Sequence, residues 1–413
     1  MKGSKLRTNS RPLKVLHLIN DLSLGGAETM LYRLLSAMDQ DRFHSAVISL
    51  RNTGDLREHI AGLGVDVYSL KIAGPVPGPT SIWRLARLLK RTKPDIIQGW
   101  LPHGNLLALV AGALTARRVP VVWNVRQSLE SLDFEKAITR QAIKLGGRLS
   151  HKPAMIVYNS RSGATQHAEF GYSSDNRIVI YNGFDTRVFT PSTAARESLR
   201  SELGVESNTI LVGLISRYHA VKNQSNFLRA AAELKKSYWN VQFVMCGSGI
   251  AWENRALRQL IQDLGLTSEV HLLGTRQDTP RIIAALDIAA SASYGEGFPN
   301  AIGEAMACAV PCVVTDVSDL SWIVKNAGIV VPRNDAGSMA RAFIQILELD
   351  PDSRRALGCN GRTRVMENFR LASVAEQFST LYESVVARNA YETTTAPLTS
   401  RAEAIPTGAS PTG

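Results

Sequence analysis

Two glutamates, Glu296 and Glu304, stand eight positions apart in a segment that changes from loop to helix character. Glu296 lies in a stretch rich in glycine and proline, and Glu304 lies among small residues typical of a buried helix. Pro299 suits the first turn of that helix, where its missing N–H costs nothing. The free backbone N–H groups of a helix start attract anions, phosphate in particular. Two hydroxyl-binding carboxylates beside such a helix start suit a nucleotide sugar.

A surface loop followed by a buried helix would explain the same two glutamates without any chemistry. The neighbouring segments favour a binding site, because residues 286–291 before the loop and 310–315 after the helix have the composition of buried strands. Strand, loop, helix and strand form the unit of a parallel sheet, which binds ligands at the carboxyl ends of its strands.

Short apolar runs alternate with helical stretches along the chain, which predicts an α/β protein with doubly wound parallel sheets. In the first half, strands are expected at 15–20, 45–50, 66–70, 95–99, 119–123 and 155–159. Turn and small residues at 183–195 indicate a linker. The pattern then restarts, with strands expected at 210–216, 241–246, 270–273, 288–291 and 310–315. Two such domains place a ligand in the crevice between them.

Two basic residues, Arg217 and Lys222, follow the strand expected at 210–216. Breaking a sugar–pyrophosphate bond requires stabilising negative charge on the departing diphosphate, and fixed cations do this well. An exposed basic loop is the alternative. Gly25 and Gly26 follow the first strand and open a helix, where glycine allows backbone N–H groups close to a phosphate. A turn without a ligand is the alternative there.

Three further residues follow predicted strands and are candidates for the crevice. His103 comes after the strand at 95–99, although a lone histidine is often structural, and Arg126 follows the strand at 119–123. Gly247 begins a Gly-Ser-Gly turn that is half of a dinucleotide fingerprint. The third glycine of that fingerprint is missing, since position 252 is tryptophan, so a nicotinamide cofactor is not expected.

Taken together, these residues resemble the retaining glycosyltransferases of family 4, whose signature is two glutamates separated by seven residues. The matching segments are Phe298-Pro299-Asn300, Glu304-Ala305-Met306-Ala307 and Gly25-Gly26-Ala27-Glu28, and the resemblance extends over nearly the whole chain. It implies the GT-B fold: two Rossmann-like domains face each other, the first holds the acceptor and the second holds the nucleotide sugar. The last helix of such folds crosses back to the first domain.

The resemblance also implies roles for particular residues. Glu296 would bind hydroxyls of the donor sugar and Glu304 those of the ribose, while Arg217 and Lys222 would contact the pyrophosphate. His103 would approach the transferred sugar. The remaining positions that match the family's site would line it on the donor side (Gly25, Gly26, Gly247, Arg276, Phe298, Pro299 and Asn300) or on the acceptor side (Glu28, Arg126 and Asn182).

Five segments follow from this organisation. We predict a basic flexible N-terminus over 1–12, an acceptor-side domain over 13–190 and a nucleotide-sugar domain over 191–370. A helix over 371–390 would cross back, and the Thr-, Ala-, Pro- and Gly-rich residues 391–413 would form a disordered tail.

The positive charge of the chain is concentrated in its first half. Residues 1–190 hold 26 lysines and arginines against 14 acidic residues, whereas residues 191–413 hold 21 against 22. A stripe with a spacing of four, defined by Lys136, Arg140, Lys144 and Arg148, is either a solvated helix face or a surface for anionic lipid headgroups or a pyrophosphate-bearing acceptor. Nucleic acid is not expected as a partner, because no zinc-finger spacing or aromatic–basic RNA motif is present.

Composition places the protein in the cytoplasm, or peripherally at the inner face of the plasma membrane. No apolar run approaches the roughly 20 residues of a membrane span, and the N-terminus lacks the apolar core of a signal peptide. The four cysteines form neither a disulfide framework nor a metal motif. We expect no cofactor and no metal, with Arg217 and Lys222 in place of a cation.

We therefore expect a metal-independent retaining glycosyltransferase. It would move a hexose or N-acetylhexosamine from a nucleotide-diphosphate sugar, with UDP favoured, to a glycan acceptor. A lipid-linked or surface polysaccharide precursor, as in lipopolysaccharide or exopolysaccharide synthesis, would serve as that acceptor. The alternatives are a nucleotide-sugar epimerase or hydrolase on the same scaffold, a catalytically silent sugar-nucleotide-binding protein and a pyridoxal-phosphate phosphorylase. No lysine stands in an obvious Schiff-base setting for the last of these.

Overall fold

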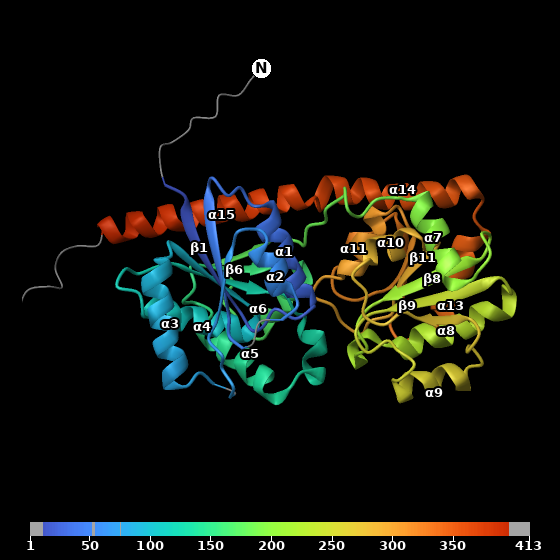
Figure 1. Ribbon diagram of the computed structural model, residues 1–413, viewed down its shortest axis with the longest axis horizontal. Helices are drawn as coiled ribbons and strands as arrows, with labels where there is room; N and C mark the ends of the chain where they lie inside the picture. Colours follow the sequence, from blue (N-terminus) through green and yellow to red (C-terminus); the bar gives the residue numbers. More distant parts are fainter. Residues whose placement is uncertain (1–10, 52–53, 75, 396–413) are drawn as a thin grey trace, which may run out of the picture.

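The computed structural model describes residues 11–51, 54–74 and 76–395. They form two α/β domains that lie side by side, with the C-terminal helices along one edge of both (Figure 1). Each domain is built around a parallel sheet with helices on its two faces. The fold class expected from the alternating pattern is therefore confirmed.

The first domain contains a seven-stranded parallel sheet in the order β3-β2-β1-β4-β5-β6-β7. Its strands are β1 (Leu13–Ile19), β2 (Phe43–Ser49), β3 (Asp66–Ser69), β4 (Ile96–Trp100), β5 (Val121–Val125), β6 (Met155–Tyr158) and β7 (Arg177–Val179). Its helices are α1 (Gly26–Ala37), α2 (Leu56–Ala61), α3 (Pro79–Thr92), α4 (Leu101–Ala113), η1 (Leu129–Phe134), α5 (Ala137–Leu149) and α6 (Arg161–Glu169). Apolar side chains of α1 and α2 pack on one face of the sheet, and those of α3 to α6 pack on the other.

The second domain contains a six-stranded parallel sheet in the order β10-β9-β8-β11-β12-β13. Its strands are β8 (Ile210–Ile215), β9 (Val241–Cys246), β10 (Val270–Leu272), β11 (Ile288–Ser291), β12 (Cys312–Thr315) and β13 (Gly328–Val331). Its helices are α7 (Thr193–Leu203), η2 (Ala220–Lys222), α8 (Gln224–Ser237), α9 (Arg255–Asp263), α10 (Thr279–Ala284), α11 (Asn300–Ala307), α12 (Leu320–Val324), α13 (Ala336–Glu348) and α14 (Pro351–Asn368). Helices α8, α9 and α13 share one core, and α7, α10, α11, α12 and α14 share the other.

The chain passes between the domains twice, and the two crossings pair with each other. Phe184 donates its N–H to the carbonyl of Phe369 at 2.8 Å and accepts the N–H of Leu371 at 3.0 Å. A Cβ on Gly183 would lie 2.8 Å from the Cα of Leu371, so only glycine fits this approach. Helix α15 (Leu371–Thr395) then packs along the first domain, as expected (Figure 1).

The ends of the chain differ in part from the expectation. Residues 391–395 continue α15 instead of beginning a disordered tail, because extending an existing helix adds one hydrogen bond for each residue fixed and so overrides weak propensities. At the other end, Arg11 forms an ion pair with Asp95 at 2.6 Å, so residue 11 is anchored rather than flexible. Residues 1–10 and 396–413 lie outside the described residues. Within residues 11–51, 54–74 and 76–395, no helix combines the length and apolar character of a membrane span.

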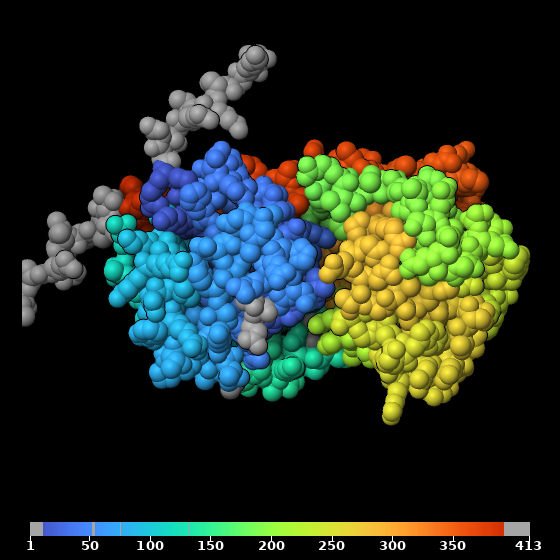
Figure 2. All heavy atoms as spheres, in the orientation of Figure 1, coloured from blue at the N-terminus to red at the C-terminus, as the bar shows by residue number. Residues whose placement is uncertain are grey.

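The two domains also contact each other directly (Figure 2). Asp319 of the second domain accepts hydrogen bonds from the N–H groups of Arg161 and Ser162, the first residues of α6, at 2.6 and 2.8 Å. A carboxylate at a helix N-terminus is favoured by the helix dipole. Phe134 stacks on Tyr294 at a centroid distance of 6.0 Å. These contacts hold the second domain against the first.

Candidate functional site

The order of the strands brings the predicted residues together at two switch points. In the first sheet, β1 lies between β2 and β4, so the connections after β1 and β4 leave in opposite directions; in the second sheet, β8 lies between β9 and β11. Ligands of such sheets bind in the crevice that opens there. Gly25 and His103 follow β1 and β4, whereas Arg217 and Glu296 follow β8 and β11.

Glu296 and Lys222 form an ion pair at the second switch point. The Lys222 Nζ donates to Glu296 Oε1 at 2.6 Å, and Ser293 Oγ donates to the same oxygen at 2.6 Å. The Lys222 and Glu296 side chains are 22% and 9% exposed, so the ion pair is largely shielded from water. The loop carrying Glu296 is held against η2 because Tyr294 donates its N–H to the Val221 carbonyl at 2.8 Å.

Arg217 follows β8, five residues before Lys222, and it is exposed. Among the described residues, its guanidinium has no hydrogen bond or ion pair, while its backbone is fixed by Gln224, whose Nε2 donates to the Arg217 carbonyl at 2.9 Å. A Cβ on Gly247 would lie 2.2 Å from the Ser216 carbonyl oxygen, and its φ of 147° is left-handed. Gly247 therefore lets the β9 loop approach the Arg217 loop.

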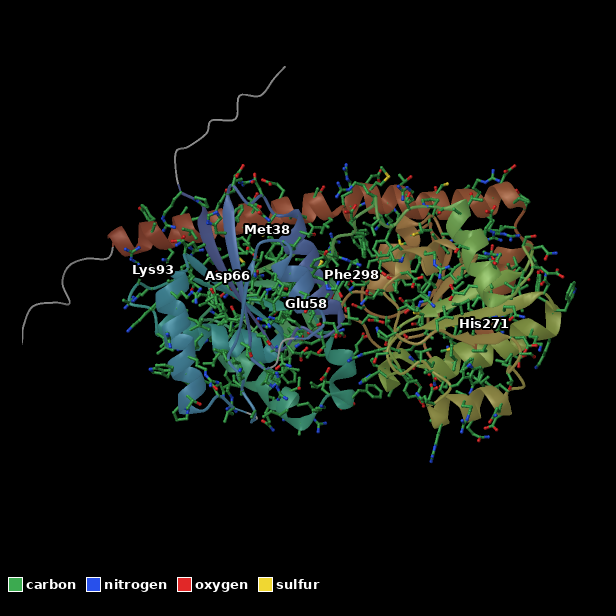
Figure 3. All side chains as sticks on the ribbon, in the orientation of Figure 1. Met38, Glu58, Asp66, Lys93, His271 and Phe298 are labelled. Atoms are coloured by element: carbon green, nitrogen blue, oxygen red, sulfur yellow. The ribbon has the colours of Figure 1, made fainter. Side chains whose placement is uncertain are left out.

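The first residue of helix α11, Asn300, contacts the start of α1 in the other domain. Asn300 Nδ2 donates to the Gly26 carbonyl at 3.4 Å, and Asn300 Oδ1 accepts from Asn182 Nδ2 at 2.6 Å. The helix begins at Asn300, so Pro299 occupies the N-cap and not the first turn that we expected. Phe298 is buried at the boundary between the domains (Figure 3), with its ring 5.7 Å from that of Phe369.

Glu304 is paired with a residue of the other domain. Its Oε1 accepts from Arg33 Nη2 of α1 at 2.5 Å, and the two side chains are 10% and 13% exposed. The Arg33 guanidinium also lies over the rings of Phe184 and Phe189, at 5.7 and 5.3 Å. The sequence patterns did not lead us to Arg33. Its position seven residues after Gly26 could have indicated it, because this spacing places both residues on one face of α1.

Glu28 is buried in the first turn of α1 and folds back toward Gly25. A Cβ on Gly25 would lie 2.3 Å from Glu28 Oε2, so a larger residue would collide with this carboxyl group. Burial raises the pKa of Glu28 to about 7; the negative charge of Asp21 adds to this rise, while the positive charge of Arg217 opposes it. Glu28 and Arg217 therefore interact electrostatically across the domain boundary.

Arg126 lies within a buried hydrogen-bond chain and not at an open surface. It donates to Asn124 Oδ1 at 2.7 Å and to Asn182 Oδ1, and its guanidinium lies 5.2 Å from the centre of the Trp100 ring. Burial lowers its pKa to about 9. Since Asn182 also bonds Asn300, this chain connects the first domain, the linker and α11.

Two other predicted residues lie in different surroundings. His103 is in the first turn of α4, half-buried, and burial with the nearby charge of Arg51 lowers its pKa. The preceding Leu101 has a φ of 64°, a left-handed conformation costly for leucine and common near functional sites. Arg276 is bound by Asp278 and Glu202, each at 2.8 Å, so its guanidinium already has partners.

Comparison with known proteins assigns a family to this arrangement. A family model described as Glycosyltransferase Family 4 matches residues 24–188, and one described as Glycosyl transferases group 1 matches residues 209–349. The chain belongs to the family 4 glycosyltransferases. Each model corresponds to one of the two domains.

Relatives and solved structures agree with this assignment. The putative glycosyltransferase EpsF of Bacillus subtilis is 24% identical over 322 residues, which are 75% of this chain and 80% of EpsF. The UDP-Gal:alpha-D-GlcNAc-diphosphoundecaprenol alpha-1,3-galactosyltransferase of Escherichia coli is 28% identical over 317 residues, 74% of this chain and 79% of its own. The crystal structure of Anabaena HepE in complex with UDP and glucose has a TM-score of 0.80 at 22% identity, and covers 90% of this chain and 100% of HepE. This glycosyltransferase has the GT-B architecture.

Replacing Glu28 by glutamine should remove a pH dependence of stability. Because the folded pKa is raised from 4.5 to about 7, the proton favours the folded state, and stability is lost as the pH rises through this interval. Relative to the wild type, Glu28→Gln should gain up to roughly 3 kcal/mol between about pH 5 and pH 8. Chemical denaturation across that range measures the difference. Glu58→Gln, at an exposed glutamate of α2, is the matched control; an equal pH-dependent gain there would contradict the assignment.

Removing Arg33 should destabilise the protein through the buried carboxylate that it leaves behind. Arg33→Met is expected to lower the free energy of unfolding by about 3 kcal/mol, because Glu304 loses its only ion-pair partner among the described residues. Arg187→Met, at an exposed arginine paired with Asp185 at 2.9 Å, makes the same chemical change and should cost less than about 1 kcal/mol. Denaturant titration compares the two, and similar losses would refute a special role for Arg33.

Proposed function

We propose that this glycosyltransferase is a retaining enzyme that moves a hexose or N-acetylhexosamine from a nucleotide-diphosphate sugar to a glycan acceptor. The observation that carries the proposal is the Lys222–Glu296 pair, which lies on the loops after β11 and β8, the second of which also carries the exposed Arg217. Helix α11, which follows Glu296, contacts Gly26 of the first domain through Asn300. This arrangement offers a carboxylate for sugar hydroxyls and cations for a diphosphate. The E. coli relative is named for UDP-Gal and HepE was solved with UDP, which supports UDP as the nucleotide.

Each residue would act on a different part of the donor. Arg217 and Lys222 would bind the diphosphate and stabilise its charge as the sugar leaves, so that no metal ion is needed. Glu296 would accept hydrogen bonds from the sugar hydroxyls, with its position fixed by Lys222 and Ser293. Glu304 would bind the ribose while it keeps its pair with Arg33, since a carboxylate offers about four lone-pair sites.

Retention of configuration would follow from substitution on one face of the sugar. The bond between the anomeric carbon and the phosphate oxygen breaks while the acceptor oxygen forms its bond on the same face. The proton of the acceptor hydroxyl passes to the departing phosphate oxygen, so no side chain has to act as a covalent nucleophile. His103 would face the sugar from the first domain.

The acceptor would be lipid-linked or a precursor of a surface polysaccharide, as in lipopolysaccharide or exopolysaccharide synthesis. The E. coli relative is named for a diphosphoundecaprenol-linked acceptor, which supports this class. The basic stripe of Lys136, Arg140, Lys144 and Arg148 is exposed along α5 and would favour anionic lipid. The enzyme would thus work in the cytoplasm, peripherally at the inner face of the plasma membrane.

Glu296→Ala and Lys222→Met should each lower turnover roughly 10- to 100-fold, the effect of losing a charge-assisted hydrogen bond to the substrate. Release of UDP from a UDP sugar in the presence of a membrane lipid extract measures this rate, and NMR of the product reports its anomeric configuration. Lys235→Met is the matched control, because it removes a half-buried lysine paired with Glu269 away from the site.

Wild-type turnover in Glu296→Ala would refute the assigned site. Inversion at the anomeric carbon would refute the retaining mechanism. If the donor is converted into an epimer or a free sugar without any acceptor, the enzyme is an epimerase or a hydrolase and not a transferase.

A further inference from the structure

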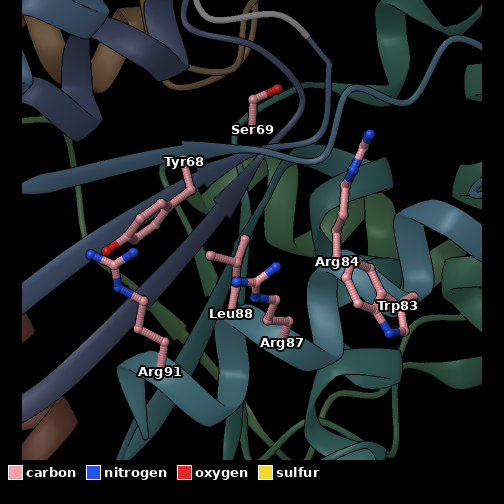
Figure 4. Close-up of a pocket in the computed structure, with 7 residues that line it drawn as sticks. All are labelled: Tyr68, Ser69, Trp83, Arg84, Arg87, Leu88 and Arg91. Atoms are coloured by element: carbon pink, nitrogen blue, oxygen red, sulfur yellow. The ribbon is translucent and has the colours of Figure 1, made fainter.

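A pocket of about 380 Å³ lies between the edge strand β3 and helix α3, on the side of the first domain away from the second (Figures 1 and 4). It is lined by Tyr68, Ser69, Trp83, Arg84, Arg87, Leu88 and Arg91. None of these residues belongs to the sugar-transfer site described above. The pocket combines three guanidinium groups with two aromatic rings.

Aromatic rings hold two of the guanidinium groups in the pocket. The Arg87 guanidinium lies 5.7 Å from the centre of the Trp83 ring, and that of Arg91 lies 5.3 Å from the Tyr68 ring. Arg84 instead donates to the Leu70 carbonyl at 3.2 Å. Stacking on a ring orients a guanidinium without neutralising its charge.

The three arginines therefore retain their positive charge. No ion pair joins Arg84, Arg87 or Arg91 to a carboxylate anywhere in residues 11–51, 54–74 and 76–395. The acidic Asp66 reaches the pocket wall through the Tyr68 hydroxyl, which donates to it at 2.8 Å. Arginine in this state is suited to binding phosphate.

The surface around the pocket carries exposed basic and apolar side chains together. Helices α3, α4 and α5 cover the same face of the sheet and contact one another in order, and none of the three contains an aspartate or a glutamate. Trp83 is 63% exposed. Other exposed apolar residues on or next to these helices are Val110, Leu114, Ile138 and Leu145. Exposed basic residues are Arg117, Arg118, Lys136, Arg140, Lys144 and Arg148.

We infer that the pocket between β3 and α3 binds the phosphate of an anionic phospholipid headgroup, with Trp83 inserted among the headgroups. A dissolved anion would use the arginines alone, whereas a membrane also accommodates the exposed tryptophan and the apolar residues of the neighbouring helices. The inference rests on the membrane-associated part of the proposed function and is independent of sugar transfer.

The pocket is also placed where a membrane would be useful to the enzyme. Ser69, in the pocket wall, ends β3, which is parallel to β2 and through it to β1. Its carboxyl end therefore lies at the same sheet edge as the Gly25–Gly26 turn. A membrane bound at the pocket would lie beside the edge of the domain where a lipid-linked acceptor has to enter.

Vesicle flotation tests this inference with phosphatidylcholine alone and with added phosphatidylglycerol. The wild type should bind only the anionic vesicles, and the triple variant Arg84→Gln, Arg87→Gln, Arg91→Gln should lose at least about tenfold in partition coefficient. The triple variant Arg229→Gln, Arg255→Gln, Arg258→Gln removes the same charge from exposed sites of the second domain and should bind like the wild type. Brominated lipid should quench the fluorescence of the wild type more than that of Trp83→Phe.

Each opposite result overturns the inference. The inference fails if the wild type does not bind anionic vesicles, or if the two triple variants bind them equally well. It also fails if the protein is released only by changing the basic stripe of Lys136, Arg140, Lys144 and Arg148 to glutamate. A soluble anion would be the ligand of the pocket instead if two results are found together. Inorganic pyrophosphate would stabilise the wild type but not the triple variant of Arg84, Arg87 and Arg91, and neither protein would bind vesicles. Thermal stabilisation by UDP sugars, measured on the same variants, should stay unchanged. This readout separates failure at the pocket from failure of the proposed donor site.

Discussion

The proposed site depends on one constraint: the first residues of α11 must face the first residues of α1, because the residues that we assign to the site are divided between the two domains. Asn300 fixes this alignment by bonding both the Gly26 carbonyl and Asn182 of the linker. Asp319 adds a second attachment by binding the N-terminus of α6. The paired chain crossings at Phe184 and the helix α15 complete the connection. Each contact joins parts of the chain far apart in sequence.

Charge is distributed around this alignment so that a diphosphate would meet positive charge. Glu296 is neutralised by Lys222 and Glu304 by Arg33, while the raised pKa of Glu28 lowers its negative charge near neutral pH. Arg217 remains exposed without an ion pair among the residues described. In the proposed site, the carboxylates would thus bind hydroxyls without repelling the phosphates. The arginines of the β3–α3 pocket likewise have no ion pair among the residues described, and this is why we expect them to bind a lipid phosphate.

The sequence predicted what depends on local periodicity and on position after a strand. The alternating pattern predicted six of the seven strands of the first sheet and five of the six strands of the second, and it missed the edge strands β7 and β13. The residues expected at strand ends, such as Lys222 and Glu296, do lie at the switch points. It could not predict the Arg33–Glu304 pair or the Asp319 contact, because these require the relative placement of two domains. It also did not predict the burial of Arg126, since an arginine after a strand is usually exposed. The rings of Trp100 and of Phe378 in α15, 5.2 and 5.9 Å from its guanidinium, come from distant parts of the chain. The catalytic roles stay predictions.

The most direct test of the proposed donor site is thermal stabilisation of the purified protein across a panel of nucleotide sugars and free nucleotides, without added metal. A nucleotide that binds the folded protein and not the unfolded chain raises its melting temperature, and at a fixed concentration the rise is larger for a tighter ligand. We expect a selective shift with one UDP series, and a much smaller shift in Lys222→Met. An equal shift in that variant, or no shift with any nucleotide sugar, would contradict a donor site built on Lys222 and Glu296.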